Sequence, residues 1–431
     1  MPTVRAFIVV CLSCLVGVCV AGEAKTDGEA VKPELLRPRD GLPNIYAKLK
    51  EGKEVRIAYF GGSITAANGW RVKTLKWFKE TYPQAKASEI NAAIGGTGSD
   101  LGVFRCRQDV LQHKPDLVFV EFAVNDGGTA PDQIYRCMEG IVRQIWSADP
   151  ATDICYVYTL HTGMKKEYES GKLPRAATAM ERVADHYGIP SINVAMKIAE
   201  MAQAGKLIYK KEKDENGADK PVPEGVMVFS GDECHPTDPA HKVYCDVITD
   251  GIKQMEAAAK PAPHTLKAPL VANNLEKAKL VPLKQEMLSP GWKKLDPKAG
   301  LGKNFADRLP EIWEGRAPGD KITFKFKGTT AKLYDLVGPD GGQAVCTVDG
   351  KTGKPQPRFD SYCSYHRLAT LYIAENLEDA VHTVSVAIHP DQPKRDSVVN
   401  KEKDKKGFDP KRYDGTVLRV GWIMLVGDPQ E

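Results

Sequence analysis

Val55-Arg56-Ile57-Ala58-Tyr59-Phe60 is an apolar run that leads directly into Gly61-Gly62-Ser63-Ile64-Thr65. The run shows little alternation of polar and apolar residues, which is typical of a strand buried on both faces of a sheet. Two glycines let the backbone turn sharply after it and leave free space above Ser63. A small-residue turn at the end of such a strand is where an α/β enzyme can hold a nucleophile above its sheet. Most turns of this composition are flexible loops, so the interpretation depends on other blocks in the chain.

Three further blocks follow in chain order, and each combines a β-rich or loop segment with polar residues. Taken alone, each has an ordinary explanation: a glycine-rich turn, an Asn-Asp turn or a structural His-Pro pair. Their joint occurrence at successive strand ends or in a returning loop favours a common site. The blocks are Asn91-Ala92-Ala93-Ile94-Gly95-Gly96-Thr97-Gly98-Ser99, Val118-Phe119-Val120-Glu121-Phe122-Ala123-Val124-Asn125-Asp126 and Asp232-Glu233-Cys234-His235-Pro236.

In this order the four blocks resemble the SGNH hydrolases, the superfamily of GDSL-type esterases, over roughly residues 53 to 256. The resemblance implies a catalytic triad of Ser63, Asp232 and His235. It also implies an oxyanion hole made by the N–H groups of Ser63 and Gly96 and the side-chain amide of Asn125. The residues alone leave open whether Gly95 or Gly96 donates, and the family pattern Asn-Ala-x-Ile-x-Gly favours Gly96.

The chemistry of ester cleavage accounts for these residue types. A serine hydroxyl needs a base within hydrogen-bond reach, which His235 would supply, and Asp232 would orient the imidazole and stabilise its charge. The oxyanion formed at the attacked carbonyl needs donors that are already in place. Cys234 is not the preferred nucleophile, because Ser63 occupies the strand end. Two residues before Asn125 the family usually has Gly, whereas this chain has Ala123.

Hydrophobic periodicity around the blocks predicts a doubly wound, mostly parallel α/β sheet, and the resemblance to the SGNH hydrolases implies the flavodoxin-like type. Apolar β-rich runs alternate with amphipathic helical patterns, and this alternation is typical of βαβ units. Ligands of such folds bind at the carboxyl ends of the strands, where the blocks lie. The expected strands are 55–60, 89–94, 117–124, 154–160 and 192–194, and the expected helices are 131–146, 174–187 and 238–259.

The rest of the 431-residue chain predicts a second domain of a different kind. Short alternating runs separated by Gly- and Asp-containing turns favour a β-sandwich. Their arrangement loosely resembles the jelly-roll modules attached to carbohydrate-active SGNH esterases. The predicted organisation is a signal peptide (1–24), a catalytic domain (25–260), a linker (261–280) and an accessory domain (281–431). Expected strands are 322–326, 331–336, 344–348, 368–374 and 383–388, and Trp313, Trp422, Tyr362 and Tyr365 are either sugar-stacking or core residues.

The N-terminus predicts export to the periplasm or the medium. Arg5 precedes an apolar run from Ala6 to Ala21, and small residues at Ala21, Gly22 and Ala24 offer cleavage positions. The run is short for a membrane span, which needs about 20 residues. Cys106, Cys137, Cys155, Cys234, Cys245, Cys346 and Cys363 remain after cleavage, and the sequence leaves open whether Cys234–Cys245 or Cys346–Cys363 form disulfides.

Composition excludes few functions. Sixty basic and 56 acidic residues give a formal net charge of +4, and the basic stretch 401–406 is interleaved with acids, so no nucleic-acid surface is expected. No cysteine or histidine spacing predicts a metal site, and no cofactor is expected. The expected function is an exported esterase that removes acyl groups, in particular O-acetyl groups, from a glycan. The alternatives are a carbohydrate O-acyltransferase, a lipase or thioesterase, or a non-catalytic glycan-binding protein. The glycan, its binding residues and the oligomeric state stay open.

Overall fold

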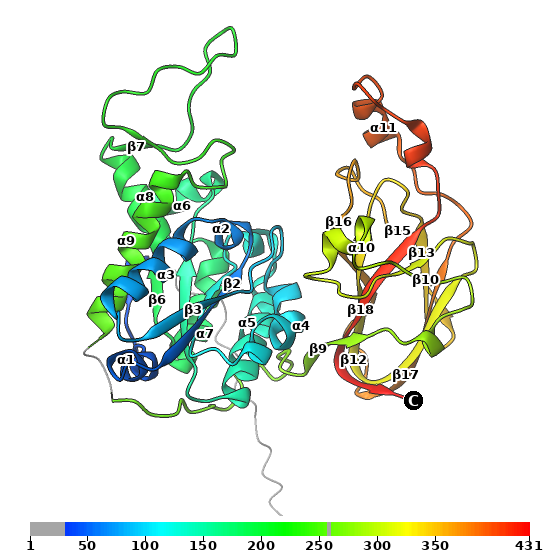
Figure 1. Cartoon of the computed structure of the whole chain (residues 1–431), viewed down its shortest axis with the longest axis horizontal. Coiled ribbons are helices and arrows are strands. Elements are labelled where there is room, and N and C mark those ends of the chain that lie inside the picture. The colour runs from blue at the N-terminus through cyan, green and yellow to red at the C-terminus, as the bar shows by residue number, and fades with distance from the viewer. Residues whose placement is uncertain (1–30, 257–259) are drawn as a thin grey trace, which may run out of the picture.

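The computed structural model describes residues 31–256 and 260–431. The expected signal peptide, residues 1–24, therefore lies outside the described residues, as does the end of the helix expected to reach residue 259. The chain forms two lobes, an α/β lobe followed by a β lobe, which meet along the strand β9 (Figure 1). No helix within the described ranges is long and apolar enough to cross a membrane.

The first lobe is built around one six-stranded sheet with the strand order β1-β6-β5-β4-β2-β3. All neighbouring strands are parallel except the short edge strand β1, which runs antiparallel to β6. The two central strands β4 and β5 are buried along their whole length. The predicted doubly wound, mostly parallel sheet is thereby confirmed. Its strands are β1 (Leu36–Arg37), β2 (Glu54–Gly61), β3 (Lys86–Asn91), β4 (Leu117–Glu121), β5 (Asp153–Tyr158) and β6 (Ser191–Asn193).

The helices of this lobe form two packed groups, as expected when a sheet is wound in both directions. Helices α4, α5 and α7 pack in sequence against one another, and α3, α8 and α9 form the other group. The apolar stripe predicted within residues 131–146 is buried in α5. The helices are α1 (Pro43–Lys50), α2 (Ser63–Ala66), α3 (Trp70–Thr81), α4 (Ser99–Asp109), α5 (Pro131–Ala148), α6 (Lys165–Glu169), α7 (Arg175–Tyr187), α8 (Val194–Gln203) and α9 (Asp238–Met255).

Strand ends differ from the prediction by a few residues. The run expected at 89–94 forms a strand that starts earlier and ends at Asn91. There the Asn91 side-chain oxygen accepts a hydrogen bond from the Ala93 N–H at 3.2 Å, which turns the chain out of the sheet. Strand β4 likewise ends at Glu121, because a helical turn begins at Phe122. The Phe122 carbonyl accepts a hydrogen bond from the Asp126 N–H at 2.9 Å. Both polar blocks consequently lie in loops beyond the sheet edge.

The second lobe is one large antiparallel sheet of ten strands. Its longest strand, β12, covers the two separate strands expected at 322–326 and 331–336, so that part of the prediction is wrong. A bulge between Gly328 and Thr330 bends β12 without breaking it. The strands are β9 (Ala278–Pro282), β10 (Lys293–Lys294), β11 (Trp313–Gly315), β12 (Lys321–Val337), β13 (Gln343–Val348), β14 (Lys351–Thr352), β15 (Gln356–Pro357), β16 (Arg367–Ala374), β17 (Ala380–Ile388) and β18 (Leu418–Gln430).

This sheet curls around its own apolar core. The first half of β12 pairs with β17 and the second half with β16, while β18 follows its other edge. Alternating residues of these strands, among them Phe324 and Leu333, are buried in one cluster. Trp313 is buried in that core and Trp422 is partly buried, whereas Tyr362 and Tyr365 are 68% and 55% exposed. Of the four aromatic residues proposed for sugar stacking, only the tyrosines are therefore open to solvent.

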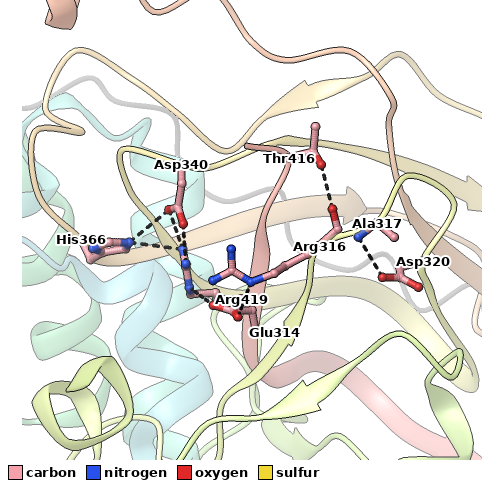
Figure 2. Close-up of polar contacts among 8 residues, drawn as sticks. All are labelled: Glu314, Arg316, Ala317, Asp320, Asp340, His366, Thr416 and Arg419. Atoms are coloured by element: carbon pink, nitrogen blue, oxygen red, sulfur yellow. Dashed lines mark hydrogen bonds and ion pairs between the residues drawn. The ribbon is translucent and has the colours of Figure 1, made fainter. Parts of the chain in front are cut away.

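An ion network around the buried Arg419 joins four segments of the second lobe (Figure 2). The Arg419 guanidinium donates to Asp340 at 2.8 and 2.6 Å and to Glu314 at 2.7 Å, and His366 lies 3.2 Å from Asp340. Burial opposes the charge of Asp340, but the hydrogen bonds from Arg419 and His366 outweigh it and hold the pKa of this carboxyl well below its usual range. The network fixes β18, β11 and the segments after β12 and before β16 relative to one another.

The two lobes meet through an apolar interface. Strand β9 packs on helix α4, and side chains from both lobes belong to one continuous buried cluster. Polar contacts support it: the Gln108 side chain donates to the Leu280 carbonyl at 3.3 Å, and Arg308 donates to the Ala93 carbonyl at 3.2 Å. The buried members contributed by the segment after residue 277 are Ala278, Leu280, Leu309, Ile312, Tyr334, Leu336, Met424 and Val426.

The seven cysteines in the described ranges are free thiols, so neither of the disulfides left open by the sequence is formed.

Candidate active site

Ser63 lies at the point where a buried strand becomes a helix. Strand β2 ends at Gly61, Gly62 precedes the helix as its N-cap, and Ser63 is the first residue of α2. A Cβ atom on Gly62 would lie 2.0 Å from the Asn125 side-chain oxygen. Only glycine fits between the nucleophile turn and Asn125, so the turn composition seen in the sequence brings these two candidate residues together.

The three predicted triad residues form one chain of hydrogen bonds. The His235 Nε2 atom lies 2.8 Å from the Ser63 hydroxyl, and His235 Nδ1 lies 2.6 Å from the Asp232 carboxylate. These distances are those of direct hydrogen bonds. The imidazole can therefore take the proton of the serine on one side while the carboxylate holds its other N–H.

A tight loop holds Asp232 and His235 in register. The Asp232 Oδ1 atom accepts from the N–H groups of Cys234 and His235 at 3.0 and 2.8 Å and from the Ser230 hydroxyl at 2.9 Å. Glu233 takes a left-handed backbone conformation, with φ of 74°, which closes the turn. The hydrogen bond from the His235 side chain, followed by that from its backbone N–H, lowers the pKa of Asp232 well below its usual range. Asp232 therefore stays charged and can stabilise an imidazolium.

The neighbouring thiol is less suited to act as a nucleophile. Cys234 is half-buried, and burial followed by the charge of Asp232 raises its thiol pKa, which disfavours the reactive thiolate. This supports Ser63 over Cys234.

The loop after β3 brings the candidate oxyanion donors to the same place. A Cβ atom on Gly95 would lie 3.5 Å from the Ser63 Cβ, so this residue lies directly beside Ser63. Gly96 follows with φ of 72°, and a Cβ atom added there would have no neighbour within 4 Å. Asn125 begins a short 3-10 helix, Asn125–Gly128, next to Gly62. Gly96 as the donor, in place of Gly95, stays a prediction.

Asp126 is a site residue that the sequence reasoning did not identify. Its carboxylate is buried and accepts a hydrogen bond at 3.0 Å from the N–H of Ser99, the first residue of α4. A Cβ atom on Gly98 would lie 2.2 Å from the same carboxylate oxygen. Burial raises the pKa of Asp126 to about 7. Asp126 thus ties the Gly95–Gly98 loop to the segment that carries Asn125, and its position directly after Asn125 is the sequence signal that could have identified it.

The site is open to solvent, with exposed fractions of 48% for the His235 side chain and 58% for that of Asp232. A surface cavity of about 630 Å³ is lined in part by Glu233, which lies between Asp232 and His235. The Glu233 carbonyl accepts from the Thr162 N–H at 2.8 Å, and Thr162 also lines the cavity. Lys210 and Lys220 form another wall. The arrangement suits a substrate larger than the ester group itself.

Residues 59–243 match the model of the GDSL-like Lipase/Acylhydrolase family. The match covers the segments that contain Ser63, Gly96, Asn125 and His235. It confirms the resemblance to the SGNH hydrolases that the sequence motifs indicate. It also confirms the expected enzyme class, a carboxylic ester hydrolase. No curated protein sequence matches the chain.

Two solved structures share the whole two-lobed architecture. One is a two-domain esterase (CEX) active on acetylated mannans, co-crystallised with mannopentaose; it is 22% identical, with a TM-score of 0.67 over 90% of this chain and 94% of that chain. The other is the same kind of esterase in a separate crystal structure, 24% identical, with a TM-score of 0.68 and the same coverage of both chains. At this identity the likeness establishes the fold, an SGNH-type domain joined to a large antiparallel β domain.

Proposed function

We propose that the protein is an exported serine esterase that removes O-acetyl groups from a neutral glycan, with Ser63, His235 and Asp232 as its triad. The observation that carries the proposal is the continuous hydrogen-bond chain from the Ser63 hydroxyl through His235 to Asp232. The predicted signal peptide supports export. The shared fold with an esterase active on acetylated mannans supports a glycan substrate and makes acetylated mannan the first substrate to test.

The reaction proceeds in two half-reactions. The Ser63 Oγ attacks the acetyl carbonyl carbon while its proton passes to His235 Nε2, and the carbonyl oxygen becomes an oxyanion held by the donors around Ser63. The carbon–oxygen bond to the sugar then breaks, and His235 returns the proton to the sugar oxygen. A water molecule, deprotonated by His235, then attacks the carbonyl carbon of the acetyl-serine. The bond from that carbon to Ser63 Oγ breaks, His235 returns the proton to Oγ, and acetate leaves. Serine and histidine leave the cycle unchanged.

The cavity beside the catalytic loop is suited to an uncharged carbohydrate. Its charged lining residues are three lysines and three glutamates, so they give no net charge for an anionic ligand. Two of the pairs are closed: Lys210–Glu233 at 3.3 Å and Lys220–Glu212 at 2.9 Å. Tyr209 contributes a half-buried aromatic ring to the lining, which can pack against a sugar ring. The lysines are Lys165, Lys210 and Lys220, and the glutamates are Glu169, Glu212 and Glu233.

Replacement of Tyr209 by alanine should raise KM for an acetylated oligosaccharide roughly 3- to 10-fold, the value of one aromatic contact, and leave kcat/KM for p-nitrophenyl acetate unchanged. Steady-state acetate release measures both. Tyr362→Ala is the matched control, because Tyr362 is an exposed tyrosine of the second lobe. Equal KM values for the Tyr209→Ala variant and the wild type would place the sugar elsewhere, and a raised KM for the control alone would assign sugar binding to the second lobe.

The proposed function is tested with a panel of esters of matched alcohol and increasing acyl length, together with acetylated mannan and acetylated xylan. We expect acetate release from at least one acetylated glycan and a steep loss of kcat/KM beyond short acyl groups. A preference for long acyl chains would identify a lipase or thioesterase. Acetyl transfer to added oligosaccharide in excess of hydrolysis would identify an acyltransferase.

A further inference from the structure

A buried carboxylate, Glu121, lies at the end of β4 next to the nucleophile turn. Glu121 is 1% exposed. In the sheet it pairs with Gly61, which lies two residues before Ser63. The triad and the oxyanion donors make no use of this side chain. A carboxylate buried in a core costs free energy unless its oxygens are well hydrogen-bonded, so its partners indicate what it does.

One carboxylate oxygen holds the nucleophile turn. Glu121 Oε2 accepts from the Thr65 hydroxyl at 2.8 Å, and Thr65 belongs to the same short helix as Ser63. The space between them is filled: a Cβ atom on Gly61 would lie 2.6 Å from the Glu121 carbonyl oxygen and 2.9 Å from the Thr65 hydroxyl. Gly61 thus lets the turn lie close against the main chain of Glu121, while the Thr65 hydroxyl binds the carboxylate.

The other oxygen reaches the segment that supports the histidine loop. Glu121 Oε1 accepts from the Thr159 hydroxyl at 2.8 Å, directly after β5. Three residues further on, the Thr162 N–H donates to the carbonyl of Glu233 at 2.8 Å, between the two loop members of the triad. Both ends of the triad are therefore connected to one side chain, Ser63 through Thr65 and His235 through the segment Thr159–Thr162.

The hydrogen-bond partners of Glu121 include no cation. Burial raises its pKa to about 7, against the effect of hydrogen bonds from Thr65, Thr159 and the Gly62 N–H. Titratable groups that interact with it electrostatically include Asp126, Cys234 and Tyr244, none of which carries positive charge, and within residues 31–256 and 260–431 Glu121 forms no ion pair. Glu121 therefore does not serve to neutralise a cation. Its three hydrogen-bond donors come from two separate segments, so we infer that it holds these segments in place.

We propose that Glu121 is a positioning residue that fixes the Ser63 turn at hydrogen-bond distance from His235. The proposal rests on the esterase function proposed above. It assigns Glu121 no contact with the substrate and no share in proton transfer. Misplacing a reacting group by about 1 Å can cost on the order of 100-fold in rate, so loss of both threonine contacts should appear in kcat.

The test compares Glu121→Ala and Glu121→Gln with the wild type on p-nitrophenyl acetate. Glu121→Ala should lower kcat roughly 10- to 100-fold with KM within about twofold, because no binding contact is lost. Glu121→Gln should keep most of the wild-type kcat, since the amide has the same shape and a threonine hydroxyl can donate to its oxygen or accept from its NH₂ group. Thr65→Val and Thr159→Val, which each remove one contact, should give smaller losses of kcat.

Glu139→Ala is the matched control, because Glu139 is also fully buried and accepts from the Tyr187 hydroxyl and the Val271 N–H at 2.6 and 2.8 Å, away from the triad. It should lower the unfolding temperature without changing kcat of the folded protein. The proposal is overturned if Glu121→Ala or, where that variant does not fold, Thr65→Val keeps the wild-type kcat. It is also overturned if Glu121→Gln loses as much as Glu121→Ala. A wild type without esterase activity would instead refute the proposed function.

Discussion

Ser63→Ala is expected to lower kcat on an acetyl ester by roughly 10⁴- to 10⁶-fold, and His235→Ala by a similar factor. The Ser63 hydroxyl forms the acyl-enzyme, and His235 at 2.8 Å is the base that its deprotonation requires. Because the two residues act in one step, the double variant should be no worse than either single variant. Steady-state kinetics on p-nitrophenyl acetate measures kcat, and circular dichroism verifies the fold.

Ser88→Ala serves as the control for the serine substitution, since Ser88 lies on β3 and its hydroxyl contacts the Val55 carbonyl at the long distance of 3.4 Å. It should behave as the wild type. A Ser63→Ala or His235→Ala variant that retains more than about a tenth of wild-type kcat would contradict the triad, because such a loss is far smaller than removal of a nucleophile or base produces.

Asn125→Ala is expected to lower kcat by roughly 100- to 1,000-fold with little change in KM. The Asn125 side chain lies against Gly62, beside Ser63, where its amide can donate to an oxyanion that exists only after attack. Asn125→Asp should be at least as harmful, because a carboxylate would face the developing negative charge. The same kinetic assay separates kcat from KM. A change confined to KM in either variant would make Asn125 a substrate-binding residue.

Much of the first domain is predictable from its sequence because each local signal agrees with the fold. The apolar run before Ser63 is a mostly buried strand, and Gly62 after it is needed because the Asn125 side chain occupies the space above it. The Asp-x-x-His spacing of Asp232 and His235 fits one tight loop. These residues stand close to strand ends that a parallel sheet brings to one edge.

Strand lengths and lobe contacts could not be predicted in the same way. The sequence pattern divides β12 into two strands, 322–326 and 331–336, whereas in the structure Gly328 pairs with Gly427 of β18 and the strand continues. The apolar residues Tyr334 and Leu336 are consistent with any buried strand, and only the structure reveals that they pack toward the first lobe. Such long-range packing leaves no periodic signal in one chain.

The roles of the two buried carboxylates could not be predicted from the sequence either. Asp126 follows Asn125 in a pair that an ordinary turn explains, and Glu121 is a single acidic residue in an apolar strand. Their importance comes from partners far along the chain, Ser99 for Asp126 and Thr159 for Glu121. Sequence spacing does not reveal such contacts, because only the tertiary structure brings each carboxylate close to its partner.

The central claim, that Ser63 is the activated nucleophile of an ester hydrolase, is tested most directly by mapping the site of covalent modification by a phosphonate ester that reacts with activated serines. Peptide mass spectrometry should find one adduct, on Ser63. The adduct should be absent in Ser63→Ala, and it should form much more slowly in His235→Ala. In the wild type, an acetylated oligosaccharide that the enzyme hydrolyses should slow its formation. Inactivation with the adduct on Cys234 or another residue would contradict the account. An enzyme that hydrolyses esters but is neither modified nor inhibited by the phosphonate would contradict it as well.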